Sequence, residues 1–186
     1  VSRRFYGTDA GVFETLFAVT RNQLMPALLI FDWGGTVMAD SGEPGPMYLW
    51  KEVAWVPGAR EALEELTMYR CCIASNAGIS DTLAMVKALE RVGADGYFDL
   101  FFTSRDLGFE KPDPRFFEAI CREAGVTPSE CVMTGDDYRK DVCGAKDFGM
   151  RTVLYNPSKA PGPFPKADAV ITNMNQLPAI IALWTT

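Results

Sequence analysis

Four polar clusters along the chain could meet in one site and act on an anion. Several carboxylates at one point repel one another, and they are stable together when a hard divalent cation such as Mg²⁺ lies between them. A lysine beside them would balance charge and hold an anionic substrate, and a serine hydroxyl would bind phosphate oxygens. These groups predict phosphoryl transfer through a phosphorylated aspartate. The clusters are Asp32, Ser75-Asn76, Lys111, and Asp136-Asp137 with Asp141.

The composition excludes several other mechanisms. The chain has no histidine, which rules out a Ser-His-Asp triad, a histidine base and a His-ligated zinc. Five cysteines without a C-x-x-C pair fit a reducing cytosol, where we expect buried structural roles for them. A net charge of −6 argues against a nucleic-acid partner. Because no apolar run approaches the ~20 residues of a membrane span, we expect a cytoplasmic protein.

Each polar cluster follows a predicted strand or the loop after one. Strand and helix patterns alternate, which predicts an α/β fold with a central parallel sheet and helices on both faces. The carboxyl ends of parallel strands meet at one edge, so the four clusters can converge there. We predict strands over 27–31, 70–74, 100–103, 131–134, 151–155 and 169–171, and helices over 58–67, 81–92, 112–125, 139–148 and 177–184.

Three segments fall outside this alternation. Residues 1–26 form an N-terminal extension in which a helix is expected over 11–19, and through which a homo-oligomer could form. Residues 37–56 form an irregular insert rich in Gly, Pro and aromatic residues, and residues 156–167 form a Pro-rich loop. The length fits a single core, which we place over 27–186.

The clusters carry a family resemblance. Phe31-Asp32-Trp33-Gly34-Gly35-Thr36 is similar to hhhDxDGT, the first motif of the haloacid dehalogenase (HAD) superfamily. The second, third and fourth motifs resemble Ala74-Ser75-Asn76, Lys111-Pro112-Asp113-Pro114 and the run from Gly135 to Val142. The four occur in order within residues 27–175. The resemblance implies a Rossmann-like three-layer sandwich and a Mg²⁺-dependent phosphohydrolase. No large cap domain is expected, because 36–57 is too short for one and 76–111 is filled by one helix and one strand.

The resemblance also implies a role for each matching residue. Asp32 would be the nucleophile and a metal ligand, and Lys111 would neutralise the nucleophile and the phosphate. Ser75 would donate its hydroxyl to the phosphate, which Gly35, Thr36 and Asn76 would also bind. Asp136, Asp141 and the backbone carbonyl of Gly34 would be further metal ligands. Asp137 stands where the family often has serine, and a helix N-cap and a ligand both remain open for it.

Gly34 departs from the family pattern. Family phosphatases have an aspartate there, which protonates the leaving oxygen and later activates water. Gly34 leaves that acid/base group missing, and such a group is worth ~10²–10⁴-fold in rate. We therefore expect substrates with low-pKa leaving groups to react faster than alkyl phosphates. Asp40 and Glu43 are expected to be solvated loop charges, with the alternative that one of them replaces the missing acid.

Two other functions remain open on the sequence alone. The first is a catalytically weak or inactive module that binds phosphate or a partner, which Gly34 favours. The second is a phosphonatase-type C–P hydrolase. That branch of the family uses a lysine as a Schiff base, and Lys51 is the only lysine of the insert. Asp136 and Asp141 argue against the metal-free dehalogenases. The aromatic residues near the insert are expected to pack locally, with a substrate entrance as the alternative: Trp33, Tyr48, Trp50 and Trp55.

Overall fold

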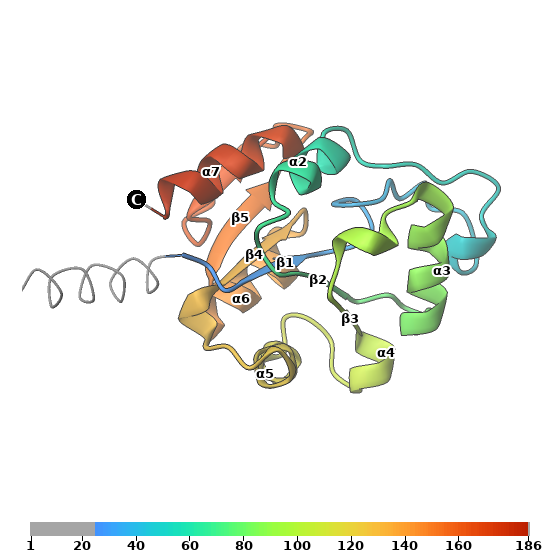
Figure 1. Ribbon diagram of the computed structural model, residues 1–186, viewed down its shortest axis with the longest axis horizontal. Coiled ribbons are helices and arrows are strands. Elements are labelled where there is room, and N and C mark those ends of the chain that lie inside the picture. The colour runs from blue at the N-terminus through green and yellow to red at the C-terminus, as the bar shows by residue number, and fades with distance from the viewer. Residues whose placement is uncertain (1–24, 186) are drawn as a thin grey trace, which may run out of the picture.

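The computed structural model describes residues 25–185, which fold around one parallel sheet (Figure 1). Its order is β3-β2-β1-β4-β5-β6, and all five neighbouring pairs run parallel. The predicted α/β fold with a central parallel sheet is confirmed. The predicted extension over 1–26, with its expected helix over 11–19, lies almost wholly outside the described residues. The strands are β1 (Leu28–Phe31), β2 (Cys71–Ser75), β3 (Leu100–Thr103), β4 (Cys131–Gly135), β5 (Arg151–Tyr155) and β6 (Ala169–Ile171).

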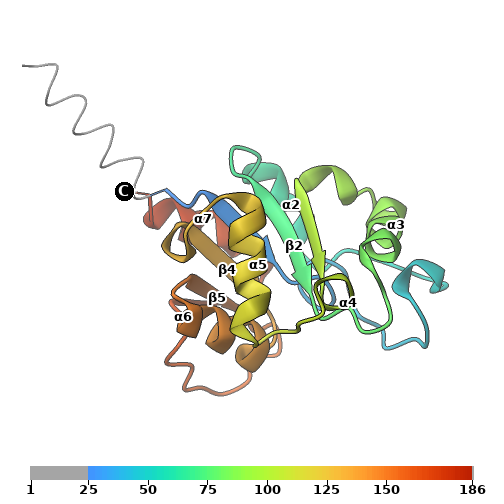
Figure 2. The ribbon, with the colours of Figure 1, turned by 90° about the horizontal axis from the view of Figure 1, so that it is seen from below.

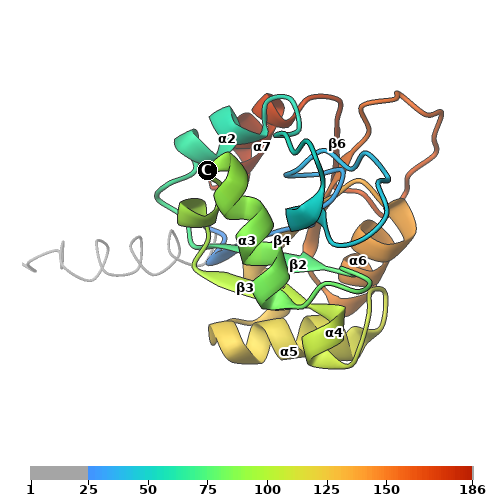
Figure 3. The same cartoon turned by 90° about the vertical axis from the view of Figure 1, so that its right-hand side faces the viewer.

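Helices cover both faces of the sheet (Figures 2 and 3). Strand side chains alternate between the faces, so Leu29 and Phe31 of β1 pack on one side and Leu28 and Ile30 on the other. The first face is covered by α2 (Ala59–Glu65), α3 (Thr82–Val92) and α7 (Leu177–Leu183). The second is covered by α5 (Pro114–Ala124) and α6 (Gly144–Phe148). None of the helices within residues 25–185 is long and apolar enough to cross a membrane.

Local signals place most helix ends within a residue or two of the prediction. Asp81 caps α3 by accepting from the Ala84 N–H at 2.8 Å, and Gly93 ends it in the left-handed conformation. Asp113 caps α5, which has proline at its first position. A one-turn helix, α4 (Ser104–Leu107), was not predicted; it follows β3 at once and is capped by Thr103.

One predicted helix is wrong in its first half. Residues 139–148 were expected to be α-helical, but Tyr138–Cys143 form a π-helical turn before α6. A π-turn contains an extra residue, which hydrophobic periodicity does not report. Asp137 caps this turn by accepting from the N–H groups of Arg139 and Lys140. Its role as a cap, one of two readings of the sequence, is therefore observed.

The strand order creates a crevice at the carboxyl edge. The chain turns to one side of β1 with β2 and β3, and to the other with β4, β5 and β6. In open α/β sheets ligands bind where the order reverses, beyond the strand ends. Asp32 directly follows β1 and Asp136 directly follows β4, and these two strands are neighbours. The reversal point therefore lies between two of the predicted site residues.

The insert over 37–56 is fixed at both ends. At its neck, Val56 donates to the Val37 carbonyl and Ala39 to the Ala54 carbonyl, each at 2.9 Å. At its tip, the short 3₁₀ helix η1 (Met47–Leu49) packs against α3. Arg91 of α3 donates to three carbonyl oxygens of this tip, those of Tyr48, Trp50 and Lys51. The insert is therefore an ordered wall beside the carboxyl edge of the sheet.

The five cysteines form no disulfide bond. Four are buried, in keeping with the structural roles expected for them: Cys71, Cys72, Cys121 and Cys131.

Candidate active site

Lys111 connects two of the predicted site carboxylates. Its ammonium group lies 2.6 Å from an oxygen of Asp32 and 2.6 Å from an oxygen of Asp141, and it also donates to the Ala74 carbonyl at 2.7 Å. The lysine side chain is 1% exposed, so both ion pairs are sheltered from solvent. Burial alone would lower the pKa of Lys111, but the charges of Asp141 and Asp32 outweigh it and raise that pKa. The lysine is therefore a fixed positive charge at the floor of the site.

Asn76 positions Lys111 through its backbone. The Asn76 side-chain amide donates to the Lys111 carbonyl at 2.8 Å, and its oxygen accepts from the Lys111 N–H at 2.7 Å. This reciprocal pair joins the end of β2 to the loop before α5. The sequence placed Asn76 at the phosphate, whereas its hydrogen bonds go to Lys111. The sequence carries no signal for a pairing across the 35 residues between them.

Three carboxylates gather at the same point. One oxygen from each of Asp32, Asp136 and Asp141 lies within 4.8 Å of the others. Burial raises the pKa of Asp141 against the opposing charge of Lys111. Burial, and next the charge of Asp32, raises the pKa of Asp136. The single lysine leaves this cluster with excess negative charge, so it favours a bound cation or a proton.

Glycines allow the carboxylates to approach the backbone. A Cβ at position 135 would overlap the Asp141 carboxylate, which also accepts from the Asp137 N–H at 3.0 Å. A Cβ at Gly35 would lie 2.5 Å from an oxygen of Asp136, and Gly35 has a φ of 81°. The Thr36 hydroxyl is buried and donates to Asp136 at 3.3 Å. The residues after Asp32 therefore shape the position of Asp136.

Replacing Gly35 with alanine is expected to damage this cluster. The change adds left-handed strain of about 1–2 kcal/mol and pushes the Asp136 carboxylate aside. Gly93→Ala is the matched control, because Gly93 has a φ of 70° and a Cβ there would meet nothing within 4 Å. Urea denaturation should show that the left-handed strain lowers the free energy of unfolding by a similar amount in both variants. Only Gly35→Ala should also weaken divalent-cation binding, and equal binding by the two variants would contradict this account.

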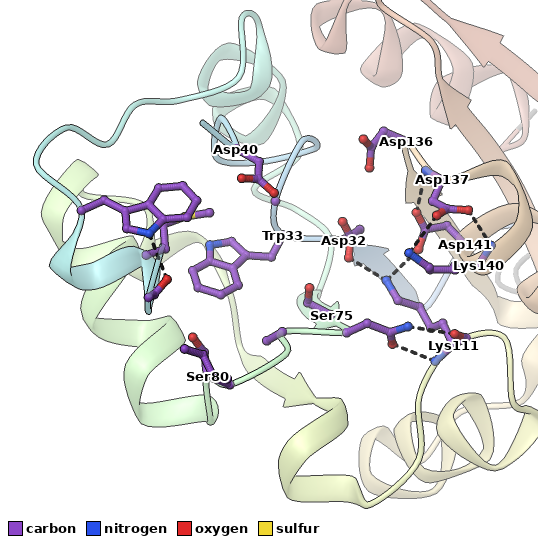
Figure 4. A pocket seen from close by; sticks show the side chains of 17 residues that line it. Asp32, Trp33, Asp40, Ser75, Ser80, Lys111, Asp136, Asp137, Lys140 and Asp141 are labelled. Carbon is purple, nitrogen blue, oxygen red and sulfur yellow. Dashed lines mark hydrogen bonds and ion pairs between the residues drawn. The ribbon is translucent and has the colours of Figure 1, made fainter. Parts of the chain in front are cut away.

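One cavity of about 350 Å³ collects most of the predicted residues (Figure 4). Asp32 is 9% exposed and Ser75 is 6% exposed, so both lie at its floor. Gly35 and Thr36, expected at the phosphate, are not among the lining residues. Lys51, the phosphonatase candidate, is also absent from them and is exposed on the insert. The predicted residues that line the cavity are Asp32, Gly34, Ser75, Asn76, Lys111, Asp136, Asp137 and Asp141.

Other lining residues were missed or left open by the sequence. Trp33 and Trp50 line the cavity and are also buried. These two residues therefore pack locally, as expected, and also form part of the cavity wall. Trp55 instead packs edge-on against Tyr97 and donates to the Val92 carbonyl. Asp40, one of the two insert carboxylates weighed above, faces the cavity. Lining residues without a recognisable signal are Met47, Ile79, Ser80 and Lys140.

Family comparison agrees with this geometry. The sequence profile described as haloacid dehalogenase-like hydrolase matches residues 49–149, just over half of the chain. The chain belongs to this family. The matched span includes Ser75, Lys111, Asp136 and Asp141, and it begins after Asp32. The hydrolase family predicted from four motifs is therefore confirmed, whereas the consequence of Gly34 and the absence of a cap domain stay predictions.

Several relatives of this HAD-like chain are phosphatases by name. A ribulose-1,5-bisphosphate 5-phosphatase from Halopiger xanaduensis is 38% identical over 122 residues, which are 66% of this chain and 51% of that protein. A glyceraldehyde 3-phosphate phosphatase from Methanothermobacter thermautotrophicus is 40% identical over 88 residues, 47% of this chain and 38% of that protein. The chain thus spans about half or less of the length of these relatives.

A solved structure shares the fold. The crystal structure of a HAD phosphatase from Thermococcus onnurineus superposes with a TM-score of 0.70 at 22% identity, covering 83% of this chain and 97% of that one. At this identity the likeness extends to the HAD fold alone.

Proposed function

We propose that this chain is a Mg²⁺-dependent phosphatase that acts on phosphate monoesters through a phosphorylated Asp32. The observation that carries the proposal is the convergence of Asp32, Lys111 and two further carboxylates on one cavity. Asp32 is the carboxylate at the end of the central strand, with one oxygen held by Lys111. A carboxylate that is fixed and partly charge-compensated is suited to attack an anion.

The donor set fits Mg²⁺. All three clustered groups offer carboxylate oxygen, the ligand type that hard divalent cations prefer, and they carry more negative charge than Lys111 compensates. Asp32, Asp136 and Asp141 would hold the ion, with the Gly34 carbonyl as a further ligand. When bound, Mg²⁺ supplies charge stabilisation to the transferring phosphoryl group.

The other catalytic contributions come from side chains of the site. The Asp32 oxygen forms the bond to phosphorus, while Lys111 offsets charge on both the nucleophile and the phosphoryl oxygens. Ser75 lies at the cavity floor and offers its hydroxyl to a phosphoryl oxygen. Asn76 holds the Lys111 backbone, so the lysine does not have to be ordered when substrate binds.

The named activities of the relatives support a substrate class. Two of them are phosphatases of ribulose bisphosphate and glyceraldehyde 3-phosphate, both small phosphorylated carbohydrates. A cavity of about 350 Å³ is of the size that holds such ligands. We therefore propose small phosphorylated carbohydrates and similar organic monophosphates as substrates.

Phosphate release from a substrate panel tests the function. The panel contains sugar phosphates, aryl phosphates and acetyl phosphate, each with and without Mg²⁺. We expect Mg²⁺-dependent release from at least one class. An absence of release from all of them, together with no phosphoenzyme, would favour the non-catalytic binding module.

Mg²⁺ should stabilise the fold through the carboxylate cluster. At about a hundredfold above its Kd, the ion is expected to raise the melting temperature by about 5–10 °C. Asp136→Asn should lose most of this shift, and without Mg²⁺ it should melt no lower than wild type because one like charge is removed. Asp147→Asn, an exposed change at a residue that does not line the cavity, should keep the shift. Thermal melting with and without Mg²⁺ measures this, and an unchanged shift in Asp136→Asn would remove Asp136 from the ligand set.

A further inference from the structure

The neighbours of Gly34 leave room for a side chain at the position of the missing acid. A Cβ added there would have ordinary contacts, with nothing closer than 3.5 Å. The φ of Gly34 lies outside the left-handed region, so the backbone itself does not require glycine. Gly34 therefore leaves a gap beside Asp32 that a side chain from elsewhere can fill.

Asp40 reaches into that gap. Its Oδ2 atom lies 3.5 Å from the position that a Cβ of residue 34 would take, and its own Cβ lies 3.7 Å from that position. Both Asp40 and Asp32 line the same cavity (Figure 4). A carboxylate from the insert thus lies in van der Waals contact with the position at which a side chain of residue 34 would begin.

The insert holds Asp40 in this place. The other carboxylate oxygen, Oδ1, accepts from the Gly42 N–H at 2.9 Å, which leaves Oδ2 directed toward Gly34. The preceding residue, Ala39, donates to the Ala54 carbonyl in the neck of the insert. Asp40 is also exposed, so solvent reaches its carboxyl group.

Nearby carboxylates have other partners. Glu43 accepts from Ser41 and from the Lys51 N–H and does not line the cavity. Asp137 caps the π-helical turn and pairs with Lys140 at 3.0 Å. Asp136 and Asp141 belong to the carboxylate cluster. Of the carboxylates lining the cavity in the described part of the chain, Asp40 is the one outside both the cluster and the cap.

We infer that Asp40 is the general acid and base of this chain, in place of the side chain that Gly34 lacks. The inference rests on the proposed function. In the first step an Asp32 oxygen bonds to phosphorus, the bond from phosphorus to the leaving oxygen breaks, and that oxygen takes the proton of the Asp40 carboxyl group. In the second, Asp40 takes a proton from water as the water oxygen bonds to phosphorus. The bond to Asp32 breaks and inorganic phosphate leaves.

The dependence of the rate on the leaving group distinguishes proton transfer by Asp40 from a structural role. Asp40→Asn keeps the oxygen that accepts from Gly42 but cannot transfer a proton. It should lower kcat on alkyl phosphates, such as sugar phosphates, by ~10²–10⁴-fold. For aryl phosphates and acetyl phosphate, whose leaving groups depart without a proton, formation of the phosphoenzyme should change less than about tenfold. Glu43→Gln, a matched change on the same insert, should leave both substrate classes at the wild-type rate.

A second variant, Gly34→Asp, tests the role of Asp40 by rescue. Gly34→Asp places a carboxylate in the same gap and should restore alkyl phosphate turnover when it is combined with Asp40→Asn. In the wild-type background the same change should add little, because Asp40 already supplies the group. A merely structural role of Asp40 would not produce rescue from position 34.

The outcomes separate the inference from the proposed function. Equal losses in the rate of phosphoenzyme formation from alkyl and aryl phosphates, or no loss with either, would overturn the role of Asp40 while leaving Asp32 chemistry in place. Wild type that releases phosphate from no substrate and forms no phosphoenzyme would overturn both. Selective loss with rescue by Gly34→Asp would establish Asp40 as the acid and base.

Discussion

Asp32→Asn is expected to abolish phosphate release, by about 10⁴-fold or more. The amide nitrogen and oxygen of asparagine cannot form the phosphorylated intermediate, although the side chain is nearly the same size. The measurement is phosphate release together with trapping of the intermediate, for which a stoichiometric beryllofluoride adduct serves as a stable mimic. Wild type should bind one equivalent at Asp32, and the variant should bind none.

Asp137→Asn is the matched control for this change. It removes a carboxylate from the wall of the same cavity, and asparagine caps a helix as well as aspartate does. We expect its rate to stay within a fewfold of wild type. Turnover retained by Asp32→Asn would sink the covalent mechanism, even if phosphatase activity itself were established.

Lys111→Met is expected to have the largest effect on stability. The change leaves Asp32 and Asp141 without the cation that lies 2.6 Å from each, in a place where the lysine side chain is only 1% exposed. Breaking a buried ion pair from one side costs about 3–5 kcal/mol. We expect urea denaturation without divalent cations to show a loss of this size in the free energy of unfolding. Turnover should also be lost.

Mg²⁺ should recover part of the stability lost in Lys111→Met, because the ion then supplies positive charge among the same carboxylates. It should not recover turnover, since the phosphoryl oxygens still lack the lysine. Lys166→Met is the control, because its ion pair with Asp147 is exposed and such pairs add little. A Lys111→Met variant as stable as wild type would mean that these carboxylates are protonated in the folded protein.

The sequence predicts the sheet well because its strands are short apolar runs separated by helix patterns, and two of these helices, α3 and α5, have clear caps. The same regularity brings Asp32, Ser75, Lys111 and Asp136 to one edge, so the carboxylate and lysine site also follows from the sequence. Asp141 was expected on a regular helix, whereas a π-turn carries it. Periodicity reports which face a residue occupies and not a one-residue bulge in the backbone.

Two features of the site could not be predicted. The Asn76 side chain pairs with the Lys111 backbone, and no pattern in the sequence reports a contact between two loops. The approach of Asp40 to Gly34 depends on the path of an irregular insert that has no period. The sequence could name Asp40 and Glu43 as alternatives, but only the geometry distinguishes them.

Arg91 has a consequence for how the cavity receives a ligand. Its guanidinium group joins three carbonyls of the insert tip to α3, so the loop loses its conformational entropy when the chain folds. That loss is then not repeated at each encounter with a substrate. The insert should act as a preformed template whose outline selects ligands by shape, and association should require little rearrangement of this wall.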